Sequence, residues 1–575
     1  PQRGPLARLR DRVAARPVST AAAAGMILLL TGTMILPILL AVSKAFYVKD
    51  QFSLFWFSQL LEDETGTHLL NGLALACATT MACLLLSVPL AVLRARTRFF
   101  GQGLLGVAVL LPLILPPFVG AMAIKSLLGQ YGAVNQLLID VGIFTRLSAP
   151  DWLESGFWGV VILQALHLFP ILYLNASAAL ANIDPAFAQA ARNLGAGPVR
   201  TFFGITLPLM RPGLFAGGTI VFIWSFTDIG TPIMLGYRPL LPVTLFDDLT
   251  GSDYTGKTFA LVVVLLTVSV GLYVLGKFFF GRQANVGGSK ATIQSDVRPL
   301  GAVGTALAWL AFGGVLLLAV LPHIGVILNA FSANWTNTVL PVEYTTEHLR
   351  SVVSDRETYR SITNSLQYAG VSTFVDLLLG SIAAWLIVRA RPLGAGLLDA
   401  MVMLPLAVPG VILAAGYVAM TVPGSLLAGI GPQNDPFALL VIAYSVRRLP
   451  FVVRGVSAGL QQVPESLEEA ARNLGCSATG TARRITLPLV MANMIAAAVL
   501  AFSFAMLEVS DSLVLAQRPG DYPITKQIYD LFTSGTGDSA NVAAALGVYG
   551  MILLGGTMAA ASLLLGKKLG AVFRA

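Results

Sequence analysis

The hexapeptide Ala190-Ala191-Arg192-Asn193-Leu194-Gly195 recurs unchanged as Ala470-Ala471-Arg472-Asn473-Leu474-Gly475, 280 positions further along the chain. At the same offset, Ile205-Thr206-Leu207-Pro208-Leu209 recurs as Ile485-Thr486-Leu487-Pro488-Leu489. Self-similarity at a fixed spacing is the signature of a duplicated structural unit. The matches therefore predict two homologous halves, over residues 1–290 and 291–575. The stretch Gly287-Gly288-Ser289-Lys290 resembles a linker between them.

Two further matches extend the repeat upstream. Leu111-Pro112-Leu113 corresponds to Leu404-Pro405-Leu406, and Arg94-Ala95-Arg96 corresponds to Arg389-Ala390-Arg391. The duplication therefore covers most of each half and is not confined to one loop.

The composition places both halves in a membrane. Of the 575 residues, 56% are apolar and only 11% are charged, and the mean hydropathy is +0.76. Soluble domains carry about 25% charged residues. These values exclude a soluble enzyme, a disordered protein and a nucleic-acid-binding protein.

The apolar stretches give a count of spanning helices. A transmembrane helix needs roughly 20 mostly apolar residues. We therefore expect an all-α membrane protein with about 12 transmembrane helices, six in each half. The expected spans are 22–43, 69–93, 104–125, 156–181, 212–235, 258–280, 303–328, 363–388, 398–420, 436–460, 491–516 and 540–566.

The distribution of basic residues predicts the orientation. Most of the 37 Lys and Arg residues fall in the two termini and in the loops on the same side as the termini, and the net charge is +8. Lys and Arg accumulate on the cytoplasmic side of membrane proteins. We expect a multi-pass protein of the bacterial inner membrane with both termini in the cytoplasm. The uncharged stretch Pro17–Ser43 is too long for a signal peptide and is interpreted as the first span.

The repeated loops, over about 182–204 and 462–484, read as a short amphipathic helix, a glycine turn and a second helix. Leu467, Ala470, Ala471 and Leu474 lie at i, i+3, i+4 and i+7, which gives one apolar face. Such a face suits a partner protein, and it equally suits packing against the chain's own helices.

The second loop resembles the EAA loop of ATP-binding-cassette importer permeases. The residues that carry the resemblance are Glu469-Ala470-Ala471, then Gly475, Ile485 and Leu487-Pro488. The first loop departs from the motif, because Gln189 stands where the glutamate is expected; it retains Ala190, Ala191 and Gly195. The loss of the glutamate suggests two unequal docking sites.

This resemblance implies a type I importer permease with fused halves. Both loops would dock on separate ATPase subunits, two copies in all, and a periplasmic binding protein would deliver the substrate. ATP and Mg²⁺ would bind those partner subunits, with no cofactor and no catalytic residue in this chain. Fused permeases of this kind occur among ferric-iron and 2-aminoethylphosphonate importers. Ferric iron is the first expectation, and 2-aminoethylphosphonate, thiamine or a polyamine are alternatives. A secondary transporter driven by an ion gradient is the alternative class.

Charged residues at membrane depth are candidates for the substrate pathway, because such residues are costly and are commonly functional. Asp228 aligns with Glu508 at the 280-residue offset, and Asp511 lies one turn further on. Hard oxygen ligands of this kind suit a cation such as ferric iron. Asp376 falls within another span. Polar contacts between helices are the alternative role for these acids.

Arg447 and Arg448 lead to the opposite inference about the cargo. Basic residues suit an anionic substrate, and they could equally pair with Glu508 or Asp511. The sequence leaves both readings open. Prolines at matched positions of spans three and nine predict either bent helices that line a cavity or plain packing kinks.

Two patterns predict no site. Gly251–Thr258 matches GxxxxGK[ST], but it lies between membrane helices and lacks the strand and soluble domain that a phosphate-binding loop needs. Cys77, Cys83 and Cys476 form no CxxC motif, so neither a disulfide framework nor a zinc site is supported. No metal site is assigned.

Overall fold

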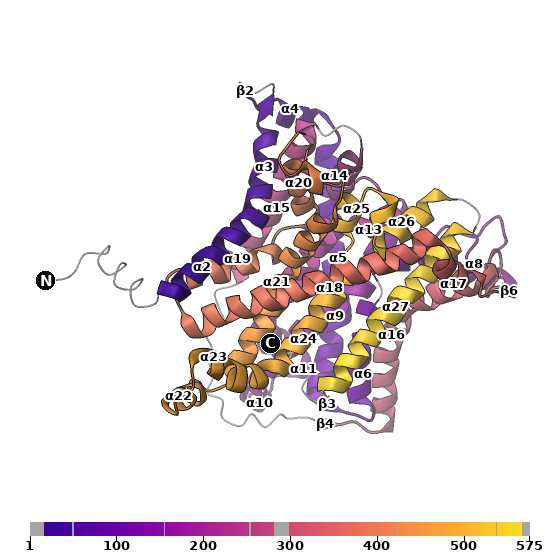
Figure 1. Cartoon of the computed structure of the whole chain (residues 1–575). Coiled ribbons are helices and arrows are strands. Elements are labelled where there is room, and N and C mark those ends of the chain that lie inside the picture. Colours follow the sequence, from indigo (N-terminus) through magenta and orange to yellow (C-terminus); the bar gives the residue numbers. More distant parts are fainter. Residues whose placement is uncertain are drawn as a thin grey trace.

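A computed structural model describes residues 17–48, 51–114, 116–153, 156–251, 255–280, 298–422, 424–535 and 538–565. The predicted linker 287–290 and the basic N-terminal residues lie outside these ranges. The described chain is predominantly helical, and three pairs of very short strands accompany the helices (Figure 1).

The elements before the predicted linker are α2 (Pro17–Leu30), η1 (Thr31–Ile35), α3 (Leu36–Ala45), β1 (Tyr47–Val48), β2 (Gln51–Phe52), α4 (Phe55–Glu62), α5 (Thr65–Arg96), β3 (Thr97–Arg98), α6 (Gln102–Ala108), η2 (Leu111–Ile114), α7 (Pro117–Leu128), α8 (Ala133–Asp140), α9 (Phe157–Ala181), α10 (Pro185–Asn193), α11 (Pro198–Thr201), η3 (Phe202–Thr206), α12 (Leu207–Thr227), α13 (Gly230–Leu235), α14 (Leu241–Thr250) and α15 (Gly256–Phe280).

The elements after it are β4 (Arg298–Pro299), α16 (Ala302–Phe331), β5 (Ser332–Asn334), β6 (Glu343–Tyr344), α17 (Glu347–Ser354), α18 (Arg356–Trp385), η5 (Leu386–Ala390), α19 (Ala395–Met403), η6 (Leu404–Leu406), α20 (Gly410–Met420), η7 (Ala428–Ile430), α21 (Phe437–Gln462), α22 (Glu465–Asn473), α23 (Ala478–Thr481), η8 (Ala482–Thr486), α24 (Leu487–Met506), α25 (Ser510–Leu515), η9 (Pro519–Asp521), α26 (Ile524–Ser534) and α27 (Ser539–Leu565). β1–β2 and β5–β6 are antiparallel, and β3–β4 is parallel.

The membrane class is confirmed. Among the described residues, eight helices are long and apolar enough to cross a membrane, or up to ten if two bent pairs each count as one span. The two other expected spans are also helical, as α15 and α21. The apolar part described for α15 is shorter, over Gly256–Leu272, and α21 carries three arginines.

Spans three and nine are broken at their prolines. The α6–η2 segment and α7 meet at 93°, and the α19–η6 segment and α20 meet at 102°. In both pairs the break follows a Leu-Pro-Leu sequence and contains a second proline, Pro116 or Pro409. Proline removes a backbone donor and clashes with the preceding turn. The sharp bends confirm that the prolines break both spans; whether the bent helices line a cavity or only pack against neighbours stays a prediction.

Spans five and eleven end earlier than expected. The helices expected over 212–235 and 491–516 stop at Thr227 and Met506, and the remaining residues form the short helices α13 and α25. Apolar residues continue beyond both breaks, so hydropathy alone placed the ends too late. Asp228 and Glu508 therefore lie at chain breaks and not inside continuous helices.

The first long helix of each half packs on the other half. α3 lies along α20 and α16 lies along α7. The hydroxyl of Tyr417 donates to the carbonyl of Thr33 at 2.8 Å, and the ammonium of Lys44 donates to the carbonyl of Ala419 at 3.0 Å. The two halves are thus interlocked.

Buried side chains of the described residues form one shared core, two further large clusters and a small fourth cluster around Ala496. The largest cluster combines residues of α7, α13 and α14 with residues of α20, α25 and α26. A second cluster belongs to the later half together with α2, and a third to the earlier half together with α16. Val490 and Met210, near the starts of α24 and α12, fall in different clusters. The halves therefore share packing at one end and separate toward the other.

Candidate functional site

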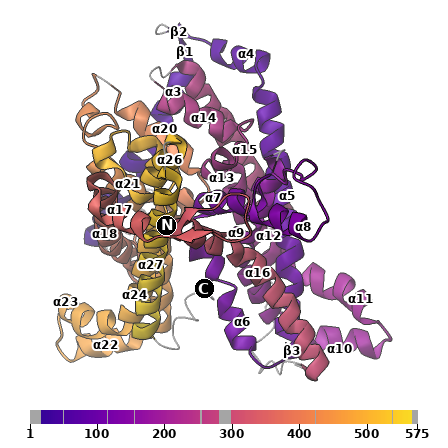
Figure 2. The same cartoon turned by 90° about the vertical axis from the view of Figure 1, so that its right-hand side faces the viewer.

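The two repeated loops lie at the same end of the molecule. α10 and α11 form one loop and α22 and α23 the other, and both views place them opposite the end that carries α4 (Figures 1 and 2). Figure 2 shows them on opposite flanks of that end. Each half therefore presents an equivalent surface to the same side.

The two loops share their glycine stop but differ in which helix has a side-chain cap. Asp184 caps α10 by accepting a hydrogen bond from the backbone N–H of Ala186 at 2.9 Å, and Ser477 caps α23 through the N–H of Gly480 at 3.1 Å. Gly195 and Gly475 have φ angles of +82° and +85°. This left-handed conformation is the common helix stop that glycine tolerates.

The loops expose apolar side chains. Leu194 is 88% exposed and Leu474 is 89% exposed, while Phe187 and Leu467 are about half exposed. Gln189, Ala190, Glu469 and Ala470 are exposed, whereas Ala191 is buried and Ala471 is half-buried. Apolar groups that remain uncovered at matched positions of both halves are typical of a protein interaction surface.

A π-helical turn follows each loop at the same repeat position. η3 covers Phe202–Thr206 and η8 covers Ala482–Thr486, and each leads into a Leu-Pro pair at the start of α12 or α24. Single π turns inside helices frequently occur at functional sites. The duplication thus preserves an irregular backbone feature between the loop and the membrane helix.

The charged residues of the later half form a buried cluster. Arg447 Nη1 lies 2.6 Å from Glu508 Oε1 and 3.4 Å from Asp511 Oδ2. Arg448 Nη2 pairs with the other Glu508 oxygen and donates to the carbonyl of Phe504 at 2.9 Å. The arginines therefore pair with the acids, which is the structural alternative left open by the sequence. Asp376 is fully buried on α18.

Asp228 is held differently, by neutral donors. Its Oδ2 accepts from Gln164 Nε2 at 2.9 Å, and its Oδ1 accepts from the backbone N–H of Gly230 at 3.1 Å. Gln164 also accepts from Ser225 at 2.6 Å. Asp228 and Glu508 are each held within their own half, although they occupy equivalent breaks. Sequence reasoning missed Gln164, because one glutamine in an apolar helix carries no spacing signal.

The helices that follow the two loops meet at their far ends. The rings of Trp224 on α12 and Phe504 on α24 pack edge to face with centroids 6.4 Å apart. These residues are equivalent in the repeat and lie four positions before Asp228 and Glu508. The contact therefore brings α12 and α24 together at the end away from the loops.

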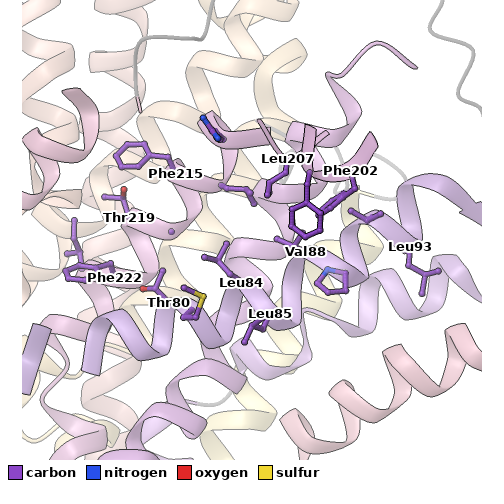
Figure 3. Close-up of a pocket in the computed structure, with 18 of the residues that line it drawn as sticks. Thr80, Leu84, Leu85, Val88, Leu93, Phe202, Leu207, Phe215, Thr219 and Phe222 are labelled. Carbon is purple, nitrogen blue, oxygen red and sulfur yellow. The ribbon is translucent and has the colours of Figure 1, made fainter. Parts of the chain in front are cut away.

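A groove of about 1210 Å³ lies between α5 and α12 (Figure 3). Its labelled side chains are apolar apart from Thr80 and Thr219, and Arg211 is its charged lining residue. Phe222 lines the groove and Trp224 follows two residues later, about 200° around the helix. The groove thus lies on a different face of α12 from the contact with Phe504, and its apolar lining suits lipid chains.

Neither a metal site nor a nucleotide site emerges from the described residues. Among them, no group of three or more His, Cys, Asp or Glu is placed to hold a metal ion. In the GxxxxGK[ST] pattern, Lys257 pairs with Asp63 and the hydroxyl of Thr258 donates to Asp248 at 3.2 Å. Residues 252–254 of that pattern lie outside the described ranges.

A duplicated, interlocked helical bundle with two matched loops exposed at one end is the architecture of the membrane subunit of a transporter. The chain belongs to the family of binding-protein-dependent transport system inner membrane components, whose sequence profile matches residues 84–284 and again 376–572. Members of this family work with ATPase and binding-protein partners in the bacterial inner membrane.

Two of the similar relatives extend over most of the chain, and a third extends over less than half of it. It is 28% identical over 503 residues to a putative ferric transport system permease protein of Haemophilus influenzae, covering 85% of this chain and 77% of the relative. It is 29% identical to a ferric transport system permease protein of Actinobacillus pleuropneumoniae, covering 72% of this chain and 59% of the relative. It is 32% identical to a probable molybdenum permease protein of Haloferax volcanii, covering 44% of this chain and 88% of the relative. These relatives are transport permeases and not enzymes.

Proposed function

We propose that this chain is the permease of an ATP-driven importer that moves ferric iron from a periplasmic binding protein into the cytoplasm. The observation that carries the proposal is the similarity to a ferric permease along 503 residues, together with the two matched docking loops. Two copies of an ATPase subunit would dock, one on each loop, and ATP–Mg²⁺ would bind those subunits.

The geometry supports an alternating mechanism. With both termini and both loops in the cytoplasm, the Trp224–Phe504 contact lies on the periplasmic side. The halves are separate at the loop end, so the conformation corresponds to an inward-facing state. Closing of the ATPase pair would bring the loops together and shift the population toward an outward-facing state.

The docking experiment uses the glycine turns. Gly195 and Gly475 have open space where a side chain would begin, so Gly475→Trp adds bulk to the exposed surface without an internal clash. The positive φ costs roughly 1–2 kcal/mol, which a protein of this size should tolerate. We expect the purified variant to remain folded and to lose binding of the ATPase subunit in a pull-down. Normal ATPase binding by Gly475→Trp would contradict the docking assignment.

The cargo is tested in proteoliposomes that contain the chain and its ATPase and binding protein. We expect ATP-dependent uptake of labelled ferric iron, unaffected by collapse of the proton gradient. Uptake of molybdate instead would point to the chemistry of the molybdenum relatives. Uptake of 2-aminoethylphosphonate, thiamine or a polyamine would likewise replace the ferric assignment. Uptake without any ATPase would indicate a secondary transporter.

A further inference from the structure

We propose that Glu468 is a positioning residue that ties the second docking loop to the membrane helices through Arg389, so that the two loops transmit movement unequally. The inference rests on the proposed function, because it concerns how ATPase movement reaches the membrane. It involves the neighbour of the motif residue Glu469. Glu469 itself is exposed, whereas Glu468 is buried.

The carboxylate of Glu468 joins three segments. Its Oε1 accepts from Arg389 Nε at 3.2 Å and from the hydroxyl of Thr486 at 3.1 Å. Its Oε2 lies 3.9 Å from Arg472 on the same helix. The side chains of Glu468 and Arg389 are 9% and 8% exposed. The pair therefore links α22 to η5, at the end of α18, and to η8, which leads into α24.

Arg389 extends the link to a further membrane helix. Its Nη2 donates to the carbonyls of Leu460 at 2.8 Å and Val463 at 2.6 Å, at the end of α21. Charge-assisted hydrogen bonds are roughly twice as strong as neutral ones. A shielded, multiply bonded arginine of this kind makes α22, α21 and α18 move as one unit. Exposed Glu465, 3.4 Å from Arg389, adds a peripheral contact.

The earlier half has the same arginine and threonine but not the acid. At the end of α5, Arg96 donates directly to Thr206 at 2.5 Å, whereas in the later half Arg389 and Thr486 both donate to Glu468. The Arg-Ala-Arg match between the halves aligns Arg389 with Arg94, but Arg94 donates to the hydroxyl of Tyr173 at 3.0 Å. The position equivalent to Glu468 is Ala188, 280 residues earlier. An alanine supplies no carboxylate, so this link cannot form through the side chain at position 188.

The second loop is therefore linked more firmly to its membrane helices than the first loop is. Movement of the second loop passes through Glu468 and Arg389 to α18, α21 and α24. The first loop is connected to its bundle without an ion pair of this kind. Removing the carboxylate from the second loop makes it resemble the first. Adding one to the first loop supplies the missing acid beside an existing arginine. Removing the carboxylate should therefore weaken the link between the second loop and its bundle, whereas adding one should strengthen that of the first loop.

The test compares Glu468→Ala with wild type in the complete transporter reconstituted in proteoliposomes. We expect the variant to retain ATPase binding and to hydrolyse ATP within about twofold of wild type, because the exposed docking face is intact. Uptake per ATP hydrolysed should fall by about fivefold or more, which is the range of a typical coupling between sites. A fall in expression alone would not change this ratio.

Two further variants complete the test. Glu465→Gln, which alters an exposed acid beside the same arginine, should change the ratio by less than about twofold. Ala188→Glu should slow backbone hydrogen exchange in α10, a gain that misfolding cannot produce. An unchanged ratio in Glu468→Ala, or unchanged exchange in Ala188→Glu, would overturn the inference. Failure of the wild-type chain to bind any ATPase would instead overturn the proposed function.

Discussion

At the scale of single residues, the two halves stabilise equivalent helix breaks with different side-chain chemistry. Both break the helix after the docking loop at an acidic residue. In the earlier half neutral donors hold Asp228, and in the later half two arginines hold Glu508. Buried ion pairs are costly to break, because the remaining charge loses its partner in a low-dielectric site.

Substitution of these acids should therefore have unequal effects on stability. Glu508→Ala leaves Arg447 and Arg448 buried without their main carboxylate and should cost about 3–5 kcal/mol. Asp228→Asn removes no charge partner and should cost about 1 kcal/mol, the value of one hydrogen bond. Thermal unfolding of the purified protein in detergent would measure the difference. Equal losses, or a larger loss for Asp228→Asn, would show that the arginine pairs are not what stabilises this region.

At the scale of elements, the sequence predicts most of what is regular and misses what is irregular. Hydropathy located all the long helices, and matched prolines indicated the bends of spans three and nine. Hydropathy could not locate the ends of α12 and α24, because the residues after each break are as apolar as those before it. Glu468 was also missed, since its role depends on Arg389, 79 positions away in the chain.

The convergence of α12 and α24 gives a test of the conformational state. In a chain with its three cysteines replaced, Trp224→Cys with Phe504→Cys should react with a flexible bifunctional thiol reagent, because the two native rings are in contact with their centroids 6.4 Å apart. The cross-link should abolish uptake by holding this end closed. Addition of ATP and the partner proteins before the reagent should lower the yield.

The control pair lies at the other ends of the same helices. Leu209→Cys and Leu489→Cys are equivalent in the repeat and are both exposed. Their neighbours Met210 and Val490 belong to separate hydrophobic clusters, so we expect no cross-link without nucleotide. A high yield from this pair in the resting protein would contradict the assignment of an inward-facing conformation.

At the scale of the whole molecule, duplication fixes orientation. Because the repeat unit carries an even number of expected spans, both halves enter the membrane in the same sense, and equivalent loops must face the same side. The structure places both docking loops at one end, in agreement with that requirement (Figure 2). The positive-inside rule predicts that this end faces the cytoplasm.

That orientation predicts which surface positions react with a membrane-impermeant reagent added outside the cell. Leu147 and Leu426 are fully exposed in loops before α9 and α21, and Leu194 and Leu474 are nearly as exposed in the docking loops. Single cysteines at Leu147 or Leu426 should react with a membrane-impermeant maleimide added to spheroplasts. Cysteines at Leu194 or Leu474 should react only after permeabilisation, since the intact membrane separates them from the reagent. Opposite labelling of Leu194 and Leu474 would mean that the halves are inverted relative to each other, which neither the even span count nor the shared position of the loops permits.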